Sequence, residues 1–148
     1  GAALWMAGGA VSILEAAGVA GALFSGPLSD RLGRKPVLSA AIGGAALSML
    51  LFVRVQGWLM FPLLLLLGFS MLSTRPVFLA IVQDHFPEHR SVANGLYMST
   101  AFLLRSAALF LVGFLGDHLG LETVYLLGAG LGLLAVPAVW LLPEKGAA

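Results

Sequence analysis

Residues 26–35 are a polar, basic segment between two long apolar stretches, and they read Gly26-Pro27-Leu28-Ser29-Asp30-Arg31-Leu32-Gly33-Arg34-Lys35. Each flanking stretch, residues 4–27 and residues 36–53, is about long enough to cross a bilayer, because a spanning helix needs roughly 20 mostly apolar residues. Gly33 offers a tight turn a residue with few steric limits. The segment therefore predicts a short loop that joins two membrane-spanning helices.

The rest of the chain repeats this alternation. Three more apolar stretches, at residues 58–82, 91–116 and 122–142, are separated by short polar breaks. Helices satisfy their backbone polar groups internally, as lipid requires, and five spans cannot form a closed barrel. Of the 148 residues, 59% are hydrophobic and 10% are charged, whereas a soluble domain has about 25% charged residues. The predicted fold is all-α, a polytopic transmembrane helical bundle of five spans.

Composition and motifs also narrow the chemistry. The chain has no cysteine, which excludes disulfides, thiolate metal sites and thiol catalysis. His85 and His89 fall in an H-x-x-E-H pattern, but Pro87 disfavours the continuous helix that such a zinc site needs. No clustered basic face indicates nucleic acid, and no phosphate-binding loop indicates an ATP-driven pump. We expect no enzyme activity, no cofactor and no metal, with the lipid bilayer as part of the solvent.

Lysine and arginine residues are distributed unevenly between the breaks. One side has Arg31, Arg34, Lys35, Arg90 and Lys145, and the other has Arg54. Cytoplasmic loops carry the excess of these residues. The first loop, the third loop and the C-terminus are therefore expected in the cytoplasm, with the protein in the inner or plasma membrane. This orientation puts Gly1 outside without a signal peptide, so we expect a fragment of a longer polypeptide.

The loop at residues 26–35 resembles the signature G-x-L-[AS]-D-R-x-G-R-[RK] of the major facilitator superfamily, with every defined position filled. In that family it occurs between helices 2 and 3 and between helices 8 and 9 of two six-helix halves. Residues 87–95 resemble the P-x-x-R-x-x-A-x-G stretch ahead of helix 5 or 11, and the following helix lacks the G-P-x-x-G-G signature of helix 5 in exporters. The resemblance implies that residues 1–148 are a C-terminal transporter domain fragment, helices 8 to 12.

The last two spans resemble the fosmidomycin-resistance branch of efflux proteins, through residues 113–120, 122–125 and 142–144. The resemblance implies secondary active transport, as an antiporter that couples efflux of a small organic molecule or drug to protons. Five helices cannot perform alternating access alone, so it also implies a missing N-terminal half in the same polypeptide. The alternative is a non-transporting membrane module, or a truncated product that packs with other membrane helices.

Six loop residues are candidates for a role in the transport cycle: Gly26, Asp30, Arg31, Gly33, Arg34 and Lys35. Gly26 allows the end of its helix to approach a neighbour closely. Asp30 can face the positive N-terminus of another helix. The three cations lie at the headgroup level, where they can pair with carboxylates or anionic lipid. The alternative is a basic loop that only sets orientation.

Three ionisable residues fall inside predicted spans, where charges are costly and usually functional: Glu15, Arg75 and Arg105. Glu15 is either a protonatable carboxylate coupled to transport or a structural partner of one of the arginines. Arg105 lies 14 residues after Ser91, about 21 Å at 1.5 Å per residue, so it is either a site for an anionic substrate or a partner of Glu15. We expect Glu15 and Arg105 to interact.

Arg75 is shallower, eight residues or about 12 Å from Gln83. It either contributes to a substrate site, extends toward the interface, or satisfies the carbonyl that Pro76 frees one turn back.

Overall fold

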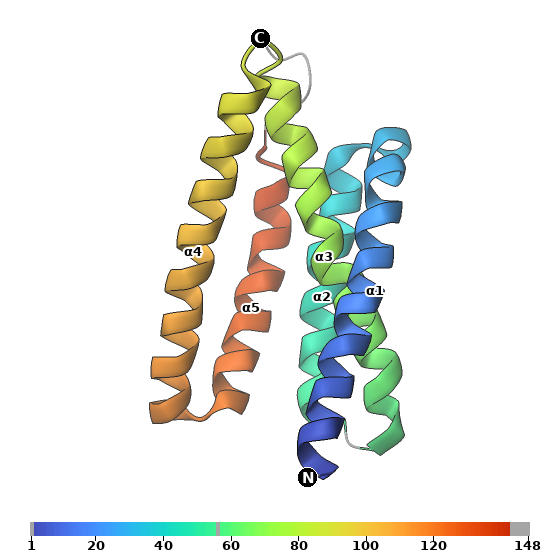
Figure 1. Cartoon of the computed structure of the whole chain (residues 1–148), viewed down its shortest axis with the longest axis vertical. Coiled ribbons are helices and arrows are strands. Elements are labelled where there is room, and N and C mark those ends of the chain that lie inside the picture. Colours follow the sequence, from blue (N-terminus) through green and yellow to red (C-terminus); the bar gives the residue numbers. More distant parts are fainter. Residues whose placement is uncertain (1, 56, 143–148) are drawn as a thin grey trace.

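A computed structural model of the chain describes residues 2–55 and 57–142 (Figure 1). Its elements are α1 (Ala2–Leu32), α2 (Arg34–Arg54), the 3-10 helix η1 (Gly57–Leu59), α3 (Met60–His85), α4 (Arg90–Leu119) and α5 (Leu121–Val139). Within this described part, five helices are long and apolar enough to cross a membrane. The predicted all-α bundle of five spans is confirmed.

Successive helices run in opposite directions (Figure 1). The α1–α2 connection, the α3–α4 connection and the end of α5 therefore lie at one end of the bundle, and the other two connections lie at the opposite end. The first end has Arg31, Arg34, Lys35 and Arg90, and the opposite end has Arg54. Lys145 lies outside the described residues. This uneven placement agrees with the predicted orientation, while the membrane side itself stays a prediction.

The first loop is shorter than the sequence predicted. Helix α1 does not end at Pro27 but continues to Leu32, and Gly33 alone separates it from α2. Gly33 has a φ of +98°, in the left-handed region that glycine tolerates best, and its N–H donates to the Ser29 carbonyl over 3.1 Å. Pro36 lies in the first turn of α2, where its missing N–H breaks no helical hydrogen bond. Nearly all of the predicted loop is thus helical.

Helices α1 and α3 pack with their backbones in close contact. A Cβ atom added to Gly21 would collide with the Phe69 carbonyl, and one added to Gly68 would collide with the Leu14 carbonyl. Small residues allow this approach, which takes the place of the hydrophobic effect as a source of stability between helices in lipid. The reciprocal glycines fix α1 and α3 as the tightest pair in the bundle.

The rest of the bundle packs more openly. Helix α2 lies between α3 and α5, and Leu38, Val77 and Val139 of these three helices form a buried cluster near one end. Helix α4 contacts α3 and α5, and Ala93 is the one buried residue among those described in it. Within the described residues, α4 makes no contact with α1, because α3 lies between them (Figure 1). Most of the surface of α4 is therefore left for lipid or for other helices.

The two ends of the bundle should lie on opposite sides of the membrane. The chain has no cysteine, so in the complete polypeptide, with any other cysteines removed, single cysteines at Glu88 and His118 become unique labels. Both positions are exposed, one in the α3–α4 connection and one in the last turn of α4. In intact cells an impermeant thiol reagent should label His118→Cys and spare Glu88→Cys, and inverted vesicles should reverse the pattern. Labelling of Glu88→Cys from outside would overturn the orientation.

Candidate functional site

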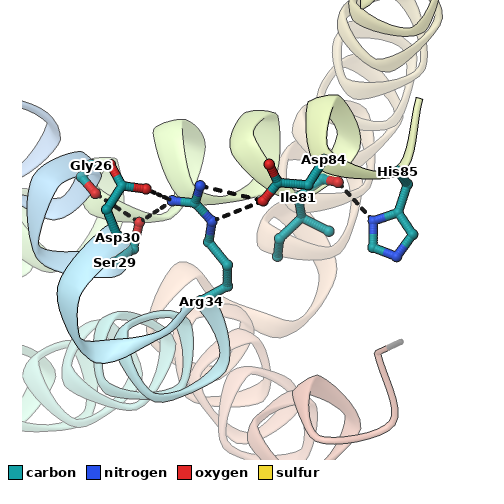
Figure 2. Close-up of polar contacts among 7 residues, drawn as sticks. All are labelled: Gly26, Ser29, Asp30, Arg34, Ile81, Asp84 and His85. Carbon is teal, nitrogen blue, oxygen red and sulfur yellow. Dashed lines mark hydrogen bonds and ion pairs between the residues drawn. The ribbon is translucent and has the colours of Figure 1, made fainter. Parts of the chain in front are cut away.

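Arg34 occupies the first position of α2, between the ends of α1 and α3 (Figure 2). Its Nη1 lies 2.6 Å from Oδ1 of Asp30 and donates a 2.7 Å hydrogen bond to Oγ of Ser29, both in the last turns of α1. Its Nε and Nη2 donate to Oδ2 of Asp84, in the last turn of α3, over 3.4 and 3.3 Å. One guanidinium therefore ties together three helices at the basic end of the bundle.

The surroundings of Arg34 explain why cations begin a helix here. A positive charge at the N-terminus of α2 is repelled by that helix's own dipole. The antiparallel arrangement brings the negative C-terminal ends of α1, α3 and α5 to the same place. Lys35 interacts with the C-terminal end of α5, where its Nζ donates a 3.2 Å hydrogen bond to the carbonyl of Trp140. The cations at the start of α2 thus stabilise the ends of its neighbours.

The predicted loop residues differ in the contacts that they make. Gly33 makes the expected turn. Gly26 does not make the expected close approach, since a Cβ there would meet nothing within 4 Å in the described part of the chain. Its carbonyl instead accepts a 2.8 Å hydrogen bond from Oγ of Ser29. Arg31 is exposed at the end of α1, and the Asp30 side chain remains 64% exposed although it pairs with Arg34.

Asp84 is the site residue that sequence reasoning missed. Its side chain is 18% exposed and that of Arg34 is 24% exposed, so this pair is more sheltered than the pair with Asp30. One signal was present in the sequence. Asp84 follows the end of a predicted span, on the side where most of the basic residues lie. A carboxylate on that side can pair with a cation.

Inside the membrane-spanning region, the structure brings together two of the three predicted residues. Arg75 of α3 and Arg105 of α4 line one cavity of about 510 Å³, together with Tyr97. Glu15 lies exposed on α1 and does not line this cavity. Because α1 and α4 are not in contact within the described residues, the expected pairing of Glu15 with Arg105 is not made there.

The alternative role for Arg75 is also not seen. In the described residues, no hydrogen bond joins its guanidinium to the carbonyl that Pro76 leaves unpaired, and the side chain is exposed. The H-x-x-E-H pattern lacks its helix, since α3 ends at His85 and α4 begins at Arg90.

Comparison with known proteins gives the family of this fold and loop. The sequence model of the Major Facilitator Superfamily matches residues 2–148. The chain belongs to this superfamily. The resemblance seen in the loop at residues 26–35 is thus confirmed, and the family points to transport rather than enzyme catalysis in a multi-pass membrane protein.

Two curated relatives extend the comparison. The fosmidomycin resistance protein of Escherichia coli K12 is 29% identical over 122 residues, which cover 82% of this chain and 30% of that protein. The gallate transporter of Pseudomonas putida is 34% identical over 128 residues, which cover 84% of this chain and 28% of that protein. The chain therefore spans less than a third of the length of these relatives. No solved structure matches it.

The pair of Arg34 and Asp84 should hold the basic end of the bundle together. Replacing Arg34 by Gln or Asp84 by Asn removes the more sheltered of the two ion pairs of Arg34, which should cost about 1–3 kcal/mol of stability. The double substitution should cost little more than either single one, because the two groups act as a pair. The measurement is the thermal unfolding midpoint of the purified protein for all four members of the cycle.

Arg31→Gln is the matched control for this cycle. Arg31 belongs to the same basic segment but is exposed at the end of α1, so its loss should change stability by less than about 0.5 kcal/mol. Additive losses from the Arg34 and Asp84 substitutions would show that the contact contributes nothing as a pair.

Proposed function

We propose that the complete polypeptide is a secondary active transporter that exports a small organic molecule or drug in exchange for protons. In this proposal the chain forms helices 8 to 12, and the N-terminal half belongs to the same polypeptide. The observation that carries the proposal is the loop at residues 26–35, which is folded into a helix-linking network in a chain of the superfamily. Support also comes from the short share of each relative that the chain covers.

The loop would act as a rigid end piece with one exposed contact point. Arg34 ties α1, α2 and α3, so these helices would move together when one half of the transporter rocks against the other. Asp30 keeps most of its side chain exposed at this end. A helix N-terminus of the other half would meet it, a contact of about 0.3–1 kcal/mol when exposed and up to about 2 when partly buried. That contribution shifts a balanced equilibrium between two transport states.

Glu15 is our candidate for the proton carrier. It lies within a membrane-spanning helix, is exposed, and has no ion-pair partner among the described residues. Carboxylates within membrane-spanning helices are rare, and those that occur mark ion pathways and proton relays. In a structural role, the charge of Glu15 would be neutralised by an arginine. In a role in proton coupling, it would be neutralised by a proton.

The proposed location is the inner or plasma membrane, with the C-terminus in the cytoplasm. The name of the fosmidomycin resistance protein favours efflux of a toxic compound, and that of the gallate transporter favours a small organic substrate. The remaining alternative, a non-transporting membrane module, is tested by the coding sequence upstream of Gly1. A transporter requires it to continue in frame for about seven more helices.

Asp30→Asn should impair transport by the complete protein while leaving membrane insertion intact, because the substitution removes the proposed contact with the other half. We expect the initial rate of proton-driven accumulation of fosmidomycin or gallate by inverted vesicles to fall at least fivefold. A fivefold change in rate corresponds to a change of about 1 kcal/mol in activation free energy. Asp117→Asn is the matched control. Asp117 is an exposed carboxylate near the C-terminal end of α4, at the end of the bundle opposite to Asp30. Equal rates in the two variants would show that Asp30 has no role in the cycle.

Glu15→Gln should separate proton coupling from substrate movement. The variant cannot release a proton, so accumulation driven by a proton gradient should be lost. Exchange of labelled for unlabelled substrate, which needs no net proton movement, should continue at near the wild-type rate. Gradient-driven accumulation that survives the substitution would remove Glu15 as the proton carrier, while loss of both activities together would indicate a structural role.

A further inference from the structure

Two arginines reach the same cavity from different helices. Arg75 lies ten residues before the end of α3 and Arg105 lies fifteen residues after the start of α4, or about 15 and 22 Å from the shared connection at 1.5 Å per residue. The offset between them along the bundle is therefore roughly 7 Å, which two long side chains can close. Both line the cavity of about 510 Å³ between these helices.

Among the described residues, those that line the cavity include two arginines and no carboxylate. Its other lining residues are neutral, and they include Tyr97, Pro76, Met98 and Phe102. Neither arginine has an ion-pair partner among the described residues. Charges at membrane depth normally have a partner or a ligand. Two guanidinium groups that line one cavity therefore favour the binding of a negatively charged group inside it.

We propose that this cavity binds the anionic group of the transported molecule, a carboxylate or phosphate group on a compact apolar body. This inference rests on the proposed transport function and names the substrate class. A guanidinium presents a planar fork of donors that matches carboxylate and phosphate oxygens, and two of them hold one anion from both sides. The Tyr97 hydroxyl adds a further donor, and the rings of Phe102 and Tyr97 contact the apolar body.

The size and lining of the cavity define what it excludes. Its volume falls in the range of about 300–1,000 Å³ that is typical of small-molecule sites. Organic cations are repelled by Arg75 and Arg105. Neutral compounds of the same shape fit the apolar wall but leave both guanidiniums without a partner, so they bind weakly.

The test compares benzoate with benzamide, which have the same shape and differ in charge, on the purified complete protein. Binding is measured as the ligand concentration that raises the thermal unfolding midpoint, and phenyl phosphate tests the second anion type. Benzoate and phenyl phosphate should stabilise the wild-type protein, and benzamide should not. Arg75→Gln and Arg105→Gln should each weaken benzoate binding at least tenfold, and Arg105→Lys should weaken it less. Arg54→Gln, at the opposite end of the bundle, removes a cation outside the cavity and should leave benzoate binding unchanged.

The outcomes separate this inference from the proposed function. Equal stabilisation by benzoate and benzamide would overturn the anion site, even in a protein that transports. So would benzoate binding that is unchanged by either arginine substitution or lost equally in Arg54→Gln. Should both glutamine variants fail to fold, wild-type selectivity together with Tyr97→Phe, which should weaken binding of both anions, decides the question. Selective anion binding that depends on the arginines, in a protein that transports none of these compounds, would keep the site and overturn transport instead.

Discussion

The contact between Arg34 and the ends of two neighbouring helices is the interaction on which the arrangement of the bundle depends. Helices in lipid gain no hydrophobic stabilisation by meeting one another, so close packing and a few polar contacts must join them. Arg34 supplies such contacts to Asp30 and Ser29 of α1 and to Asp84 of α3 at once. The left-handed turn at Gly33 makes this possible, because it returns the chain within one residue and places Arg34 beside both helices.

Hydropathy predicted the five spans because each span depends on its own composition, and the conformational freedom of glycine predicted the turn at Gly33. The ends of the helices were harder to predict. Pro27 looked like a helix end, but transmembrane helices tolerate proline, and α1 passes through it to Leu32. Asp84 was missed because its partner Arg34 lies 50 residues away in sequence. Charge counting places both at one end of the bundle but cannot state which helices are neighbours there.

The intramembrane residues show the same limit. Depth along a helix follows from residue number, so the sequence could place Arg75 and Arg105 inside the membrane. Which helix faces which does not follow from depth. The reciprocal glycine contacts, Gly21 against α3 and Gly68 against α1, put α3 beside α1 and leave α4 on the other side of α3. That packing keeps Glu15 away from Arg105, which instead lines a cavity together with Arg75.

The bundle therefore uses arginine in two different ways, and the local supply of carboxylates separates them. At the basic end, Arg34 is neutralised by two aspartates of its own chain, which makes that end rigid. At depth, Arg75 and Arg105 line a cavity in which the described residues supply no carboxylate. A charge there costs about 2.5–3.5 kcal/mol at the centre of a membrane helix, and an anion that bridges the two helices offsets that cost for both. The rigid end and the open cavity thus assign anchoring and substrate binding to different parts of one bundle.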